Sequence, residues 1–242
     1  MTQDETWLLH EKYDGEKIEG FFADCTRLSN GEPLAYIIGW TPFLHTKIFL
    51  DSKPLIPRTE TEFWVEQVMQ KIKPRAKVLD LCAGSGCIGV AVAYAIPNIE
   101  VDFAELDTKH HATIQKNIQE NNIDSKRTHI FGGDLFAEVT DTYDFILTNP
   151  PYIDPILDRA TESVKNFEPR LALYGGMSGM ECIVKILESA SSKLTPNGTL
   201  VIEHEPEQIT EIHRHAAQNG FFPSSFPDQF GVMRYTICVR TP

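Results

Sequence analysis

The stretch that decides the fold is KVLDLCAGSGCIG, residues 77–89. Its first part, Lys77–Cys82, is a short apolar run that predicts a strand. The turn Gly84–Gly86 follows and leads into an apolar helix. Glycines let the backbone approach a ligand closely, and the first N–H groups of a helix have no partner within the helix. This strand, turn and helix therefore predict an α/β fold with a ligand site at the turn.

Short apolar runs continue to alternate with amphipathic stretches along the rest of the chain, which predicts a sheet covered by helices on both faces. Six further strands are predicted, at 100–105, 128–131, 143–149, 199–203, 221–225 and 234–240. Further helices are predicted at 108–121, 178–194 and 207–219. The predicted fold is a seven-stranded, doubly wound, Rossmann-like α/β domain over residues 77–242.

Residues 1–76 have a different character from the rest of the chain. Two short helices are predicted at 5–13 and 16–28, and a strand-and-turn region of the β-hairpin type follows. We therefore expect a short N-terminal helical and hairpin appendage beside the main domain. Within the main domain, residues 152–177 lack periodicity, and a loop of that length is usually functional or disordered.

The composition argues against several classes of protein. The net charge is −12, with 22 basic and 34 acidic residues, whereas proteins that follow a nucleic-acid backbone usually carry a basic stripe. The longest apolar run, 87–96, is far shorter than the ~20 residues that span a membrane. The acidic N-terminus lacks the basic and apolar regions of a secretion signal, so a cytoplasmic protein is expected.

The five cysteines and eight histidines do not indicate a metal site. The cysteines are scattered, odd in number and without C-x-x-C spacing, which also argues against a disulfide framework. The neighbouring histidines His213 and His215 would point in different directions on a helix, since helical neighbours lie three or four residues apart. No metal is therefore expected.

Two acidic residues indicate which ligand the glycine turn holds. Taken literally, Gly84–Gly89 matches G-x-G-x-x-G, which alone does not separate a nicotinamide cofactor from S-adenosylmethionine. Asp80, four residues before the first glycine, favours S-adenosylmethionine because it could reach the cationic amino group. Glu105 lies nineteen residues after Gly86, near the spacing of a carboxylate that binds ribose hydroxyls. Asp107 is instead expected to cap the next helix.

The sharpest motif, Asn149-Pro150-Pro151-Tyr152, lies where the fourth strand ends, at the sheet edge where open α/β folds bind ligands. An amide nitrogen is a poor nucleophile because its lone pair is delocalised into the carbonyl. The Asn149 side-chain oxygen and the Pro150 carbonyl could hold both N–H hydrogens and aim the nitrogen at a methyl group. Tyr152 offers a flat wall for a planar group. The motif predicts methyl transfer to a planar amide or amine nitrogen.

When several further motifs are considered together with these, the chain resembles the HemK/PrmC family of protein-(glutamine-N5) methyltransferases. Members of this family modify the Gly-Gly-Gln motif of peptide-chain release factors. The resemblance runs from about residue 31 to residue 240. It is carried by GEPLAYIIGW at 31–40, LIPRTETE at 55–62, DLCAGSG at 80–86, GDLF at 133–136, NPPYI at 149–153, FEPRLALYGG at 167–176, EH at 203–204 and DQFGVMR at 228–234. It implies a class I methyltransferase domain that uses S-adenosylmethionine.

The resemblance also implies roles for particular residues. The acceptor amide would be held by Asn149, Pro150 and Tyr152. The cofactor would lie among Asp80, Cys82, Ala83, Gly84, Gly86, Glu105, Leu106, Asp134, Leu135 and Asn149. The substrate side of the site would include Arg58, Glu60, Glu62, Pro151 and Glu168. A helix capping box at Thr59–Glu62 and a loop brace at Glu168–Arg170 are equally good interpretations of those two segments.

The chain departs from the family pattern in two places that bear on function. Cys82 and Ala83 stand where glycine and threonine are usual, and Thr59 stands where proline is common. The family's N-terminal substrate-docking domain is expected to be shortened here, so a partner subunit could take its place. Because Asn-Pro-Pro-Tyr also occurs in adenine-N6 DNA methyltransferases, three functions stay open. They are methylation of a protein glutamine, methylation of a nucleic-acid adenine, and cofactor binding by a partner protein without catalysis.

Overall fold

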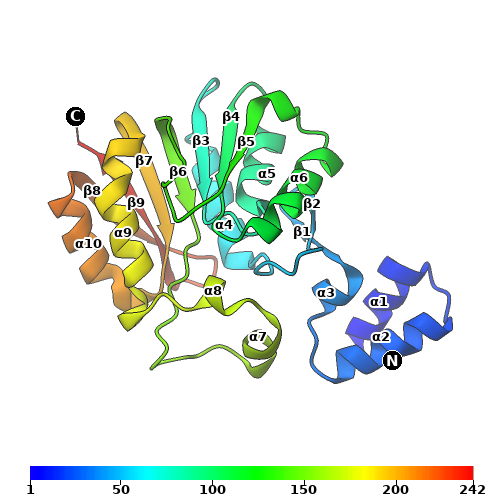
Figure 1. Cartoon of the computed structure of the whole chain (residues 1–242). Coiled ribbons are helices and arrows are strands. Elements are labelled where there is room, and N and C mark those ends of the chain that lie inside the picture. Colours follow the sequence, from blue (N-terminus) through cyan, green and yellow to red (C-terminus); the bar gives the residue numbers. More distant parts are fainter. Residues whose placement is uncertain (242) are drawn as a thin grey trace.

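The computed structural model describes residues 1–241, and its main body is one sheet with helices on both faces (Figure 1). The strands are β3 (Lys77–Leu81), β4 (Glu100–Ala104), β5 (Thr128–Phe131), β6 (Tyr143–Thr148), β7 (Leu194–Glu203), β8 (Phe221–Pro227) and β9 (Met233–Arg240). Their order across the sheet is β5-β4-β3-β6-β7-β9-β8. The predicted seven-stranded, doubly wound α/β fold is confirmed.

Helices α4 (Thr59–Met69), α5 (Cys87–Ala95) and α6 (His111–Glu120) cover one face of the sheet, and α9 (Glu181–Ala190) and α10 (Ile209–Gln218) cover the other (Figure 1). Each face has its own buried apolar cluster. Neighbouring residues of a strand point to opposite faces, so Val78 belongs to the first cluster and Leu79 to the second. The sheet is therefore buried on both sides, as its apolar strands predict.

Shorter elements connect these. Residues 149–180 contain α7 (Glu162–Phe167), α8 (Arg170–Leu173), one 3₁₀ turn and a single bridge between Ile153 and Tyr174. Single 3₁₀ turns lie at Thr108–His110, Ser125–Arg127, Met177–Gly179, Ser191–Lys193 and Pro206–Gln208. The segment predicted to lack periodicity is thus a long connection with two helices of less than two turns.

Five strands run parallel, and their carboxyl ends are level. Leu81 pairs with Ala104 of β4 and with Thr148 of β6, and Thr148 pairs with Ile202 of β7. Strands β8 and β9 run antiparallel at one side of the sheet. The residues that follow β3, β4, β6 and β7 therefore emerge next to one another at a single edge.

The start of β7 differs from the sequence prediction. The predicted helix 178–194 ends earlier, with α9 at Ala190, and Pro196-Asn197-Gly198 lies inside β7 instead of before it. The register with β6 jumps there, because Tyr143 pairs with Leu194 but Phe145 with Thr199. Asn197 has a φ of 63°. These three residues form a bulge that interrupts the strand without ending it.

The N-terminal helices α1 (Gln3–Tyr13), α2 (Glu19–Ser29) and α3 (Leu34–Ile38) lie beside the main body (Figure 1). They share a small separate core made of Leu8, Leu9, Phe21 and Ile37. The hairpin of β1 (Trp40–Phe43) and β2 (Thr46–Phe49) instead packs with α4 into the core of the main sheet. The domain boundary at residues 76/77 stays a prediction, and this packing favours a division just after α3.

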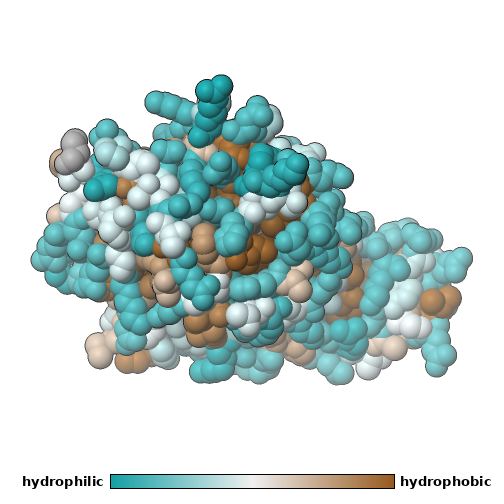
Figure 2. Space-filling model, turned by 45° about the horizontal axis from the view of Figure 1, so that its top comes forward, coloured by the Kyte–Doolittle hydropathy of each residue, from teal (hydrophilic) through white to brown (hydrophobic). Residues whose placement is uncertain are grey.

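The face shown in Figure 2 is mostly hydrophilic, with hydrophobic residues gathered in a recess near its middle. Large apolar side chains are also exposed on the N-terminal helices, at Trp7 and Phe22. No helix within residues 1–241 is long and apolar enough to cross a membrane.

Close packing of α5 against β4 predicts the effect of one substitution. A Cβ at Gly89 would lie 2.4 Å from the Phe103 ring and 3.0 Å from the Asp80 Cβ. We expect Gly89→Ala to lower the free energy of unfolding by about 1–3 kcal/mol, the usual cost of overpacking a core. Urea unfolding measures it. Gly132→Ala is the control, since its Cβ would make only ordinary contacts. Equal stability of the two variants would contradict the packing.

Candidate functional site

The turn after β3 begins at Cys82, whose φ of 60° is left-handed. Glycine adopts this conformation without strain, which gives a physical reason for the glycine that is usual there. Cys82 lines a cavity together with Cys182 of α9, and the neighbouring Cys82 thiol lowers the pKa of Cys182. A side chain at position 82 thus adds a second thiol to the wall of the cavity.

Asp80 lies in β3, just before the glycine turn. Its side chain is fully buried, and Oδ2 accepts a hydrogen bond of 2.8 Å from the Gly89 N–H in the first turns of α5. Burial raises the pKa of Asp80 well above its usual value. The residue lines neither of the two cavities that adjoin Asn149. The Oδ2 atom of Asp80 thus ties the strand to the helix, while contact of Asp80 with a ligand's amino group stays a prediction.

Glu105 follows β4 and faces the glycine turn. Its Oε2 accepts from the Gly84 N–H at 2.7 Å, and Oε1 accepts from the Asp107 N–H at 2.8 Å. Burial raises the pKa of Glu105. Each carboxylate oxygen retains a second lone pair that could accept from a ligand. Asp107 caps the following 3₁₀ turn by accepting from the Lys109 N–H, as predicted.

These residues surround a first cavity of about 470 Å³. The predicted cofactor residues that line it are Cys82, Ala83, Gly84, Glu105, Leu106, Asp134, Leu135 and Asn149; Asp80 and Gly86 do not. His110, Cys182 and Lys185 also line it and were missed. They come from α9 and from the turn after β4, and no motif in the sequence marks them.

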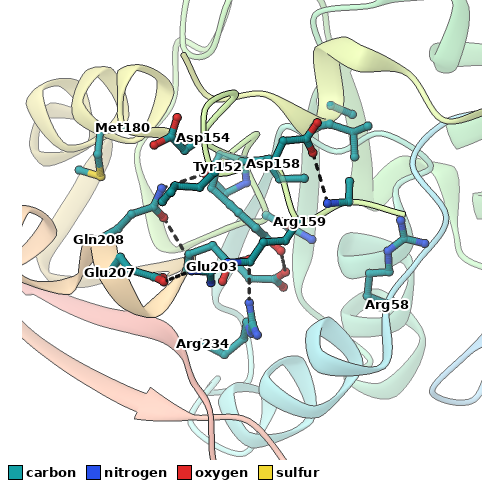
Figure 3. A pocket seen from close by; sticks show the side chains of 18 of the residues that line it. Arg58, Tyr152, Asp154, Asp158, Arg159, Met180, Glu203, Glu207, Gln208 and Arg234 are labelled. Carbon is teal, nitrogen blue, oxygen red and sulfur yellow. Dashed lines mark hydrogen bonds and ion pairs between the residues drawn. The ribbon is translucent and has the colours of Figure 1, made fainter. Parts of the chain in front are cut away.

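A second cavity, of about 670 Å³, lies beyond Asn149 (Figure 3). It is lined by four of the predicted substrate residues, Arg58, Glu60, Pro150 and Tyr152, whereas Pro151 faces the first cavity. Of the described residues, only Leu55, Asn149 and Ala172 line both cavities. Asn149 therefore stands at the junction between them.

Glu203 closes the inner wall of the second cavity, where it faces Tyr152 (Figure 3). Its buried carboxylate accepts from Tyr152 Oη at 2.9 Å, from Trp64 Nε1 at 2.7 Å and from Thr61 Oγ1 at 2.6 Å. The Asn149 Nδ2 in turn donates to Thr61 Oγ1 at 3.1 Å. Glu203 was noted only as part of a family motif. The register of β6 with β7 is the signal that could have placed it beside Asn149.

Glu168 braces a loop. Its carboxylate accepts from Arg58 Nη2 at 2.6 Å and from the Ile56 N–H at 3.0 Å, with 1% of the side chain exposed. It lines neither cavity, and these contacts favour the loop-brace interpretation, while a role on the substrate side stays a prediction. The capping box is wrong. Thr59 is already the first residue of α4, and Glu62 accepts from the Leu44 N–H instead.

Comparison with known proteins decides the family. Residues 59–167 match the "Methyltransferase small domain" model. A "Release factor glutamine methyltransferase" of Borreliella burgdorferi is 34% identical over 204 residues, which cover 83% of this chain and 70% of the relative. The chain belongs to the release factor glutamine methyltransferase family. A "Ribosomal protein uL3 glutamine methyltransferase" of Bradyrhizobium diazoefficiens is 32% identical, over 73% of this chain and 59% of that relative.

Solved structures agree on the fold of this family member. A methyltransferase from Pyrococcus furiosus superposes with a TM-score of 0.63 at 19% identity, covering 91% of this chain and 99% of that one. The two chains thus share the class I methyltransferase fold.

His204 is held within the sheet by two hydrogen bonds. His204 Nδ1 lies 2.9 Å from the Glu205 carbonyl and therefore donates to it, so Nε2 accepts from Thr236 Oγ1 at 2.7 Å. Burial lowers the pKa of His204 to about 4. Within residues 1–241 no group of three or more His, Cys, Asp or Glu side chains could hold a metal ion.

The depressed pKa of His204 predicts a pH dependence of stability. An unfolded histidine binds a proton below about pH 6.5, whereas the folded ring stays neutral down to about pH 4. Its stabilising contribution is thus complete above pH 6.5 and is lost as the pH falls, by about 1.4 kcal/mol per pH unit. We expect the difference in unfolding free energy between wild type and His204→Gln, from urea unfolding, to shrink from pH 7 to pH 5. A difference independent of pH would contradict the assignment.

Proposed function

We propose that this protein transfers a methyl group from S-adenosylmethionine to the side-chain amide of a protein glutamine. The observation that carries the proposal is the position of Asn149, which lines both cavities. A residue at that junction can hold an acceptor in the second cavity while its nitrogen faces a methyl donor in the first. Positioning of this kind accounts for a large share of the rate enhancement in many transfer reactions.

The first cavity suits the proposed cofactor. Glu105 presents two oxygens with spare lone pairs, which match the two hydroxyls of a ribose. The apolar Leu106 and Leu135 offer surfaces for a flat base. Asp80 Oδ1 is a buried polar atom that finds no hydrogen-bond partner among residues 1–241. When bound, the cofactor supplies an electrophilic methyl group on a sulfonium centre.

The second cavity suits a primary amide. Among residues 1–241 no hydrogen bond occupies Asn149 Oδ1, because the bonded end of this side chain is Nδ2. Oδ1 and the Pro150 carbonyl can therefore accept the two N–H hydrogens of an acceptor amide, with Tyr152 packed against its plane. No general base is required in the transition state, since the methylated nitrogen becomes acidic and loses its proton afterwards.

The charges around the second cavity favour a protein acceptor over a nucleic acid. Seven acidic residues line it, against three arginines. Each arginine is already paired: Arg58 with Glu168, Arg159 with Glu207, and Arg234 with Glu205 and Asp228. Phosphate binding requires available cationic donors, and this lining offers none within residues 1–241. An uncharged or basic peptide segment does not need such cationic donors.

The family name suggests which protein supplies the glutamine. Relatives named as release factor glutamine methyltransferases match most of the chain, so a peptide-chain release factor is the first candidate acceptor. A relative named for ribosomal protein uL3 makes that protein the natural comparison. A partner subunit that helps to dock the acceptor stays part of the proposal.

The cofactor assignment predicts the effect of removing one carboxylate. Glu105→Ala loses the acceptor for a ribose and also the brace on the Gly84 N–H. We expect affinity for S-adenosylhomocysteine, measured by calorimetry, to fall about tenfold or more, since hydrogen bonds to charged groups contribute about 1.5–3 kcal/mol. Glu100→Ala, at the far end of β4, is the matched control. Unchanged affinity in Glu105→Ala, or tight NAD binding by wild type, would overturn the assignment.

The acceptor assignment predicts where the methyl group goes. With release factor, ribosomal protein uL3, tRNA and duplex DNA offered together at physiological salt, radiolabelled methyl should appear on a protein glutamine. Asn149→Ala should lower turnover about a hundredfold, the scale for losing one preorganised polar contact, with cofactor affinity little changed. Label on adenine, or wild-type turnover in the variant, would refute the proposal.

A further inference from the structure

The proposed function depends on which end of the Asn149 amide faces the second cavity. The two ends are nearly identical in shape, so the surrounding hydrogen bonds must distinguish them. Only Oδ1 can accept from an acceptor amide. If Nδ2 pointed into the cavity, its hydrogens would meet the hydrogens of the acceptor, and the acceptor would be repelled.

We infer that Thr61 and Glu203 are positioning residues that fix the orientation of the Asn149 amide. Asn149 Nδ2 donates to Thr61 Oγ1 at 3.1 Å, and Thr61 Oγ1 donates to Glu203 Oε2 at 2.6 Å. The hydroxyl proton of Thr61 is therefore committed to the carboxylate. Thr61 can then only accept from Asn149, and only Nδ2 can donate to it. Oδ1 is left facing the acceptor side.

The direction of the hydrogen bonds from Asn149 to Thr61 and from Thr61 to Glu203 follows from the partners of Glu203. A carboxylate has no hydrogen to donate, and the Trp64 Nε1 that also contacts Oε2, at 2.7 Å, can only donate. Both donors thus converge on one oxygen of a side chain that is 1% exposed. Burial raises the pKa of Glu203, while the hydrogen bonds from Thr61, Trp64 and Tyr152 lower it. The donors therefore favour the ionised form of Glu203, which is the form that accepts the hydrogen bond from Thr61.

The other oxygen of Glu203 holds Tyr152, which also lines the second cavity. Tyr152 Oη donates to Oε1 at 2.9 Å, and Gln208 Nε2 donates to the Tyr152 carbonyl at 2.8 Å (Figure 3). One carboxylate thus links the amide of Asn149, through Thr61, with the ring of Tyr152. Neither Thr61 nor Glu203 needs to touch the acceptor to influence its position.

The first test needs no acceptor, so it is independent of the proposed function. In ¹⁵N-labelled protein with S-adenosylhomocysteine bound, the Asn149 side-chain amide is assigned by its loss in Asn149→Ala. We expect its hydrogens to exchange with solvent at least about tenfold faster in Thr61→Val, which keeps the shape of the side chain but lacks the hydroxyl. Thr61→Ser, which keeps the hydroxyl, should behave as wild type. Equal exchange in all three proteins would overturn the inference.

The second test measures turnover with the acceptor that wild type methylates. Thr61→Val should lower kcat about tenfold, equivalent to about 1.4 kcal/mol, with KM for the acceptor changed less than about twofold. Thr61→Ser should restore kcat. Thr61 also borders the first cavity, so calorimetry with S-adenosylhomocysteine checks that cofactor affinity is retained.

A double-mutant cycle separates positioning from a merely structural role. If Thr61 acts through Asn149, then Thr61→Val should cost little further activity in an Asn149→Ala background, because the amide it orients is gone. Additive losses would overturn the inference. If Thr61→Val does not fold, Thr61→Ala serves as the second hydroxyl-free variant, since alanine favours the helix. Slow amide exchange as expected, but no glutamine methylation by wild type, would refute only the proposed function.

Discussion

The matched register of the parallel strands is the constraint on which the rest of the structure depends. Leu81, Ala104, Thr148 and Ile202 lie level with one another on four strands that together carry the site. Whatever residue follows each of them is forced to the same edge. This is how the glycine turn, the carboxylate of Glu105 and the amide of Asn149, from distant parts of the chain, come to surround adjoining cavities. A slip of one strand by a single residue would turn its side chains to the opposite face.

Motifs whose functional residues lie close together in the sequence could be predicted from the sequence. The glycine turn, Glu105 and the Asn149–Tyr152 segment each carry their chemistry within a few residues, and the structure brings them to the cavities. Residues whose role depends on a distant partner could not be placed. For Glu168 the sequence left a substrate role and a loop brace equally open, because nothing in its neighbourhood reveals that Arg58, more than a hundred positions away, contacts it. Cys182 and His110 reach the first cavity only through topology.

Three buried carboxylates at this edge of the sheet differ in how many hydrogen bonds they accept. Glu203 accepts from three side chains and Glu105 from two backbone N–H groups, whereas Asp80 Oδ1 has no partner in the described part of the chain. Burying a charge without hydrogen bonds is costly, and burial raises the pKa of all three carboxyls. Such groups are concentrated where a fold has been shaped for chemistry more than for stability. The sequence indicated two of these acids, but only the structure shows how differently they are held.

The long connection between β6 and α9 contributes to both cavities, yet its two ends are held together by the bridge between Ile153 and Tyr174. Between those points the chain makes an excursion of about twenty residues that the sheet does not constrain. Lengthening a loop whose ends are already joined costs little entropy. Insertions or replacements there can reshape the wall that meets an acceptor while the glycine turn and Glu105 stay unchanged. In evolutionary terms, descendants of this chain could acquire new acceptors by remodelling one loop, with no need to rebuild the fold or the remaining cavity.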